Sequence, residues 1–199
     1  GNIASLETRY EDTFPYMVSK KLNFSKFYQQ SMGGTTTPSL IDRFSSYFSH
    51  CEPEIIIIQA GIIDLTPRSL GIYEHEVLKV FSRSICDKIK NNKYLAEKRN
   101  VRYVSKKKFR QSITKLSLIF DEAKIFWILP IIDYKTSSSS MKMNHEEYCN
   151  IIKKIFPDTY LDLNEDFSLN NGFMPDKIHY SKKGHQIITK KICNKIYTY

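Results

Sequence analysis

The fold class of this chain is indicated by one segment, Glu54-Ile-Ile-Ile-Ile-Gln-Ala-Gly-Ile-Ile-Asp-Leu-Thr-Pro-Arg68. Its four consecutive isoleucines predict a strand that is buried on both faces, which is typical of a parallel sheet between two layers of helices. The run ends at Gly61, and Asp64 and Arg68 follow directly. Because ligands of open α/β sheets bind beyond the carboxyl ends of the strands, we expect functional side chains after this strand.

The rest of the chain alternates between strand and helix patterns, as an α/β layer fold requires. Further strands are predicted at residues 24–29, 125–132 and 160–163. Helices are predicted at residues 14–22, 38–50, 74–89, 109–123, 144–156 and 181–196. Ser137 to Ser140 is expected to form an exposed loop. The sequence therefore predicts a three-layer α/β/α sandwich with a parallel sheet, built as a single domain over residues 1–199.

Composition narrows the class of protein further. Hydrophobic residues make up 41% of the 199 residues, which is ordinary for a globular protein. The longest apolar runs have the length of a strand, far short of the roughly 20 residues that cross a bilayer. The chain shows no signal-peptide pattern, so we expect a cytoplasmic protein. Four scattered cysteines lack metal-ligand spacing, so we expect buried thiols and no metal or other cofactor: Cys51, Cys86, Cys149 and Cys193.

Two segments carry the residue types of acyl-transfer chemistry. Asp176-Lys-Ile-His179 precedes the last predicted helix, and its carboxylate can hold one ring nitrogen while the other accepts a proton from a nucleophile. Gly33 and Gly34 follow the strand predicted at 24–29, and paired glycines allow backbone N–H groups to face an oxyanion. His185, at the start of the last helix, is instead predicted to be structural.

In their order along the chain, these segments resemble the SGNH (GDSL-type) hydrolase superfamily of esterases and acyltransferases, especially a divergent branch associated with bacterial surface-polysaccharide genes. Gly34 matches the oxyanion glycine of the family, and Asp176 with His179 matches its Asp-x-x-His block. Gly61-Ile-Ile-Asp64 matches its Gly-x-Asn-Asp turn, and the stretch from Arg9 to Tyr16 is similar to the one that follows its nucleophile turn. The resemblance implies a flavodoxin-like SGNH hydrolase fold.

Two positions depart from the family pattern. Ile63 replaces the asparagine that donates to the oxyanion, and losing one such donor typically costs about 10²–10³ in turnover. Ile3 stands where the nucleophilic serine belongs, and Ser5 serves as nucleophile if the turn is shifted along the chain. The alternative is that the serine is absent and the site is inactive or altered. The family's first strand normally precedes this turn, so we expect either residues removed before it or a sheet completed in another way.

Asp64 and Arg68 are the candidate substrate-binding residues, and each has an alternative role. A carboxylate at a strand end often caps the loop that follows, and an arginine there often pairs with a neighbouring acid. Trp127 lies within an apolar strand pattern and is most simply part of the core.

The net charge of +9 is concentrated in one segment. Between Lys88 and Arg110 there are ten Lys or Arg residues against one acid, Glu97, which indicates a basic helical insertion. The insertion is either a solvated basic surface or a site for an anionic glycan, an anionic membrane surface or nucleic acid, and no nucleic-acid motif supports the last. The helix predicted just before it carries an apolar stripe of Val77, Val80, Phe81 and Ile85.

Together these features predict a serine esterase or O-acyltransferase that acts on acyl esters, such as acetyl esters, of a carbohydrate. The predicted catalytic residues are Ser5 as nucleophile, His179 as general base, Asp176 as its partner and Gly34 as oxyanion donor. The alternative is a catalytically degenerate protein of the same fold that binds a glycan or a partner in polysaccharide assembly, which Ile3 and Ile63 favour.

Overall fold

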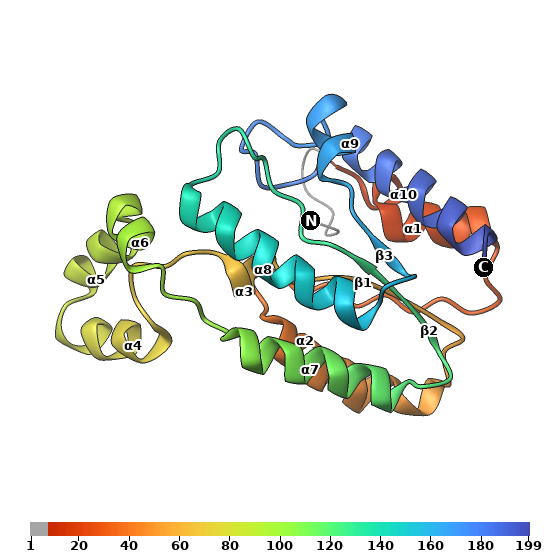
Figure 1. Cartoon of the computed structure of the whole chain (residues 1–199), viewed down its shortest axis with the longest axis horizontal. Helices are drawn as coiled ribbons and strands as arrows, with labels where there is room; N and C mark the ends of the chain where they lie inside the picture. The colour runs from red at the N-terminus through yellow and green to blue at the C-terminus, as the bar shows by residue number, and fades with distance from the viewer. Residues whose placement is uncertain (1–7) are drawn as a thin grey trace.

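The fold is built on a parallel sheet at the centre of the molecule (Figure 1). The computed structural model describes residues 8–199. Within that range the strands are β1 (Ile55–Gln59), β2 (Lys124–Ile128) and β3 (Tyr160–Leu161), in the order β1-β2-β3. β1 is the strand predicted from the isoleucine run, and its Ile55 pairs with Lys124 of β2.

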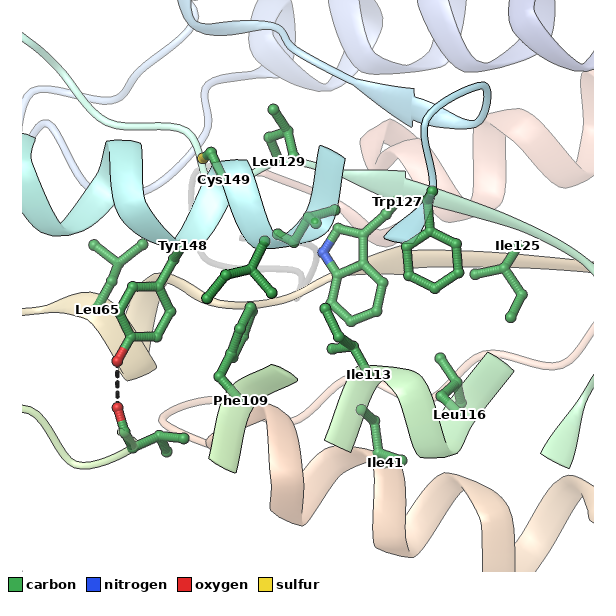
Figure 2. Packing of buried hydrophobic residues seen from close by; sticks show 14 of the residues in the cluster. Ile41, Leu65, Phe109, Ile113, Leu116, Ile125, Trp127, Leu129, Tyr148 and Cys149 are labelled. Atoms are coloured by element: carbon green, nitrogen blue, oxygen red, sulfur yellow. Dashed lines mark hydrogen bonds between the residues drawn. The ribbon is translucent and has the colours of Figure 1, made fainter. Parts of the chain in front are cut away.

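Three helices cover one face of the sheet. They are α2 (Thr37–Phe48), α7 (Lys106–Ile119) and α8 (Ser139–Ile155). Figure 2 shows the core between them and the sheet, in which Trp127 of β2 is fully buried in a cluster that includes side chains from all three helices. Phe109 of α7 packs on Tyr148 of α8, with ring centroids 4.9 Å apart. Trp127 is a core residue, as predicted.

Two further helices, α1 (Phe14–Leu22) and α10 (Lys182–Tyr197), cover the opposite face. Phe126 and Ile128 alternate with Trp127 along β2 and point into this second core, because successive side chains of a strand face opposite sides. Ile188 and Ile192 of α10 are fully buried there. The two cores make three layers, so the predicted α/β/α architecture is confirmed.

The remaining elements link these layers, and some of them correct predicted boundaries. They are η1 (Tyr10–Asp12), η2 (Ser49–Cys51), α3 (Ile62–Leu65), α4 (Ile72–Phe81), α5 (Arg83–Lys90), α6 (Lys93–Arg99) and α9 (Asn164–Leu169). The single helix predicted at 74–89 is wrong, because Ser82 is extended and its hydroxyl caps α5 by accepting from the Ile85 N–H. The predicted serine loop is only partly a loop, since Ser138 caps α8 in the same way and the helix begins at Ser139.

The strand predicted at 24–29 is wrong. This segment is irregular, and in the described part of the chain β1 has β2 as its one strand neighbour. The other edge of β1 and this segment line an apolar cavity of about 520 Å³, with Phe24, Ile56 and Ile58 among its walls. A strand needs a partner for its backbone N–H and C=O groups, and no described strand lies beside residues 24–29 to supply one.

The cysteines do not form disulfides. Cys86, Cys149 and Cys193 are buried, and Cys51 is exposed. Within residues 8–199, no helix is long and apolar enough to cross a bilayer, and no cluster of side chains suits a metal ion.

His185 joins the two helices on the second face, as its predicted structural role requires. Its Nδ1 accepts the backbone N–H of Phe14 at 3.2 Å, and burial lowers the pKa of the ring to about 4. An unfolded chain takes up this proton near pH 6.5 and the folded chain does not, so acid favours unfolding.

We therefore expect the free energy of unfolding to depend on His185 between pH 4 and pH 6.5. Asp64 acts with the opposite sign over the same range, because burial raises its pKa to about 6, so the wild-type profile alone mixes the two. In urea titrations, the stability of wild type relative to His185→Gln should rise by roughly 2–4 kcal/mol from pH 4 to pH 6.5 and then level off. A difference that stays constant across this range would contradict the assignment.

Candidate active site

The candidate site lies where β1 ends, and glycine is required there. Gly61 has a φ of +117°, and a Cβ at this position would lie 2.8 Å from Cγ of Pro130, in the segment after β2. A side chain would therefore meet both backbone strain and a steric clash. The turn brings the chain directly from β1 into α3, so the segments after β1 and β2 lie against each other.

Asp176 and His179 form the pair that the sequence predicted. His179 Nδ1 lies 2.6 Å from Asp176 Oδ2, and the backbone N–H groups of His179 and Ile178 donate to Oδ1. The hydrogen bond from the ring, followed by those from the two N–H groups, lowers the pKa of Asp176 to about 2. Because an ionised carboxylate can only accept, Nδ1 is the donor, and in the neutral imidazole the lone pair is then on Nε2. The His179 side chain is 62% exposed, so Nε2 is accessible to a reacting group.

The loop that carries this pair is closed at both ends. Phe173 and Tyr180 form an antiparallel bridge, and the Met174 N–H donates to the His179 carbonyl at 2.8 Å. Gly172 and Gly184 pack so closely that a Cβ on Gly184 would lie 2.1 Å from the Gly172 oxygen. Such a loop holds its imidazole in place before any substrate arrives.

A hydrogen bond from β1 fixes this loop to the sheet. The side-chain amide of Gln59, at the end of β1, donates to the hydroxyl of Tyr180 at 2.6 Å. Tyr180 is buried and directly follows His179. Sequence reasoning did not identify Gln59 or Tyr180, although a polar residue closing an isoleucine run is a signal that could have pointed to Gln59.

The glycine loop before α2 contains the predicted oxyanion donor. Gly34 has a φ of +69° and is exposed, and apart from Gly34 and its two chain neighbours no heavy atom of the described residues lies within 4 Å of the position that a Cβ would take. Its left-handed backbone suits glycine, and the open space around it leaves room for a ligand.

Asp64 connects this glycine loop to the turn after β1. It is fully buried on α3, and its two oxygens accept the backbone N–H of Thr37 at 3.0 and 3.1 Å; the Thr37 hydroxyl also donates to Oδ2. The expected substrate contact is therefore not available to Asp64. Its carboxylate instead caps α2. The alternative prediction, that it caps the loop after its own strand, is therefore not what the structure shows.

Removing this carboxylate should destabilise the fold. In Asp64→Ala the buried N–H and hydroxyl of Thr37 lose their acceptor, so we expect the free energy of unfolding to fall by about 1–3 kcal/mol in urea titrations at pH 7. Asp64→Asn keeps one acceptor and should lose less. Equal stability of the alanine variant and wild type would show that the contact contributes nothing.

Arg68 follows Asp64 by four residues and contacts a different partner. Its guanidinium stacks over the Tyr103 ring with 4.9 Å to the centroid, and its backbone pairs with Val101. The ion pairs found within residues 8–199 do not include Arg68, so the alternative of an ion pair is not seen there. Substrate binding by Arg68 stays a prediction.

The remaining candidates divide between the described and undescribed parts of the chain. Ser5 and Ile3 lie outside the described residues, so Ser5 as nucleophile stays a prediction. Ile63 lies on α3 and is half-buried, and its side chain cannot donate a hydrogen bond. His145 carries no catalytic prediction, and it is buried with its Nε2 against the Pro130 carbonyl and its Nδ1 accepting from Tyr134.

The chain is similar to a known protein family and to several solved structures. The family model of the GDSL-like lipase/acylhydrolases matches residues 6–192. No curated protein matches the chain. Among solved structures, the α/β hydrolase LAE5 from the metagenome of Lake Arreo, Spain, is 14% identical, with a TM-score of 0.65 over 98% of this chain and 85% of LAE5.

A second solved structure is Axe2, an acetylxylan esterase from Geobacillus stearothermophilus. It is 16% identical, with a TM-score of 0.63 over 92% of this chain and 80% of Axe2. Catalytic mutants of Axe2 replace a serine, an aspartate or a histidine by alanine, and the aspartate precedes the histidine by three positions. At these identities the likeness establishes the fold of the chain.

Proposed function

Because the chain belongs to the GDSL-like lipase/acylhydrolase family, and is thus a hydrolase acting on ester bonds, we propose that it removes acetyl groups from an O-acetylated carbohydrate. The observation that carries the proposal is the Asp176–His179 pair, with an accessible Nε2, at the carboxyl end of a parallel sheet. The same aspartate-to-histidine spacing occurs at the catalytic positions of Axe2, which acts on acetylated xylan.

The proposed reaction has two halves. His179 Nε2 takes the proton of the nucleophilic hydroxyl, predicted to be that of Ser5, while the oxygen attacks the acyl carbonyl. The imidazolium, stabilised by the Asp176 carboxylate, then gives the proton to the departing sugar oxygen as the ester bond breaks. In the second half a water molecule loses its proton to Nε2 and attacks the acyl-enzyme, which releases acetate and restores the hydroxyl.

In this proposal the oxyanion is stabilised by a backbone N–H group. The Gly34 loop is open and Asp64 holds its far end, so the Gly34 N–H is the proposed donor. Ile63 supplies no side-chain donor where the family has asparagine. We therefore expect turnover about 10²–10³ below that of a relative with the full set of donors.

The open site favours water as the acyl acceptor, because the His179 ring is largely exposed to solvent. In an O-acyltransferase a sugar hydroxyl would take the place of this water. A degenerate binding protein is the second candidate, and Ile63 at a donor position favours it.

The proposal is tested with acetylated xylo-oligosaccharide, p-nitrophenyl acetate and p-nitrophenyl octanoate. Acetate release from the oligosaccharide is followed by NMR, and p-nitrophenolate release from the two esters is followed by absorbance. We expect the acetyl substrates to react faster than the octanoyl ester, and Asp176→Asn to lose most of the activity. Faster hydrolysis of the octanoyl ester would contradict the carbohydrate proposal and would indicate a lipase instead. Binding of the oligosaccharide without turnover would support the degenerate alternative.

A further inference from the structure

The helix α4 turns an apolar stripe toward solvent. Tyr73, Val77, Val80 and Phe81 recur at the spacing of one helix face, and Tyr73, Val80 and Phe81 are 88%, 85% and 81% exposed. A stripe of this kind normally packs on the core. Here α4, α5 and α6 form a lobe beyond α3, at the end of the molecule where β1 ends (Figure 1). The stripe therefore lies on the surface of that lobe, away from both cores of the sheet.

The same lobe is rich in unpaired positive charge. Between Ile72 and Arg99 the sequence has seven Lys or Arg residues against four acids. Arg99 pairs with Glu74 at 2.7 Å, and within the described residues no ion pair involves the other six. These exposed cations are Lys79, Arg83, Lys88, Lys90, Lys93 and Lys98. Lys79 and Arg83 bracket Val80 and Phe81 in the sequence, so charge and apolar surface adjoin.

From this juxtaposition we propose that the α4–α6 lobe docks onto an anionic membrane surface. Valine and phenylalanine side chains can enter the boundary between headgroups and acyl chains, while lysine and arginine reach the lipid phosphates. An anionic glycan would use the positive charge and would gain nothing from exposed valine. A second copy of the chain would bring two positive lobes together, which charge repulsion opposes.

The lobe is held to the body of the protein, so docking would orient the whole molecule. Arg99 donates to the Ser69 carbonyl at 2.6 Å, and Arg68 pairs with Val101 across the base of the lobe. Gln59, at the end of β1, contacts Tyr180 in the loop that carries His179, so this loop lies at the end of β1 beyond which the lobe extends (Figure 1). Docking would therefore place the candidate active site near the membrane surface.

Vesicle flotation tests the proposal and does not depend on catalytic activity. One set of vesicles contains phosphatidylcholine alone, and the other contains equal amounts of phosphatidylcholine and phosphatidylglycerol. We expect binding to the second set, lost at high salt. The double variant V80S/F81S should weaken it by about tenfold or more, from the apolar surface removed. L118S/L169S, which alters two exposed leucines outside the lobe, is the matched control and should bind like wild type.

Three results with vesicles would overturn the proposal. They are absence of binding to the anionic vesicles, equal binding to both vesicle types, and undiminished binding of V80S/F81S. Light scattering after size-exclusion chromatography tests whether the apolar stripe binds a second copy of the chain. A dimer of the wild-type protein that dissociates in V80S/F81S would assign the stripe to self-association instead.

Discussion

Replacing His179 by alanine is expected to lower kcat/KM for an acetyl ester by about 10⁴-fold or more, because the general base of the reaction is lost. The ring is mostly exposed, and the loop around it is held by backbone hydrogen bonds and by Tyr180. We therefore expect the free energy of unfolding to change by only about 0.5 kcal/mol. Initial rates with p-nitrophenyl acetate and urea titrations measure the two effects separately.

His50→Ala is the matched control, since His50 is exposed on η2, far along the chain from the pair. It should keep wild-type activity. The kcat/KM of Asp176→Asn should lie between those of wild type and His179→Ala, because the amide keeps the shape of the carboxylate without its charge. Wild-type turnover in His179→Ala would remove the histidine from the mechanism.

Replacing Gly184 by alanine should lower both stability and activity. The added methyl group would lie 2.1 Å from the Gly172 carbonyl oxygen and 3.0 Å from Cε1 of Phe167, and a backbone atom cannot move aside as a flexible side chain can. The same carbonyl accepts the Ser181 N–H, which closes the His179 loop. We expect the free energy of unfolding to fall by about 3 kcal/mol or more, together with a loss of esterase activity.

Gly71→Ala is the control for this change. A Cβ at Gly71 would meet its neighbours at 3.6 Å or more, which is ordinary contact, and its φ of −72° suits alanine. Its stability should stay within about 0.5 kcal/mol of wild type. If Gly184→Ala were as stable as this control, the close approach of residues 172 and 184 would not constrain the fold.

Hydrophobic patterns in the sequence predicted the strands and helices that pack within the regular layers of the fold. The isoleucine run forms β1, and the helix predicted at 14–22 has the bounds of α1. The segment 24–29 has a strand-like composition, yet it is irregular because no described strand pairs with it. The helix predicted at 74–89 has continuous apolar spacing, but the break at Ser82 depends on a capping bond that spacing does not reveal.

The contact between Asp176 and His179 was predicted because the two residues are close in sequence. Asp176 and His179 are three positions apart, so their pairing follows from local geometry. Gln59 and Tyr180 are separated by 121 positions, and Asp64 and Thr37 by 27, so these contacts exist only once the fold is formed. Such long-range contacts decide that Asp64 supports the glycine loop instead of binding substrate.

In the proposed mechanism His179 activates a serine, and covalent labelling with a fluorophosphonate probe detects such a serine. Folded protein is treated with the probe, and the modified residue is mapped by mass spectrometry in wild type and in His179→Ala. We predict a label on Ser5 that is lost in the variant. A folded wild-type protein that takes no label, or one labelled equally with and without His179, would contradict the claim.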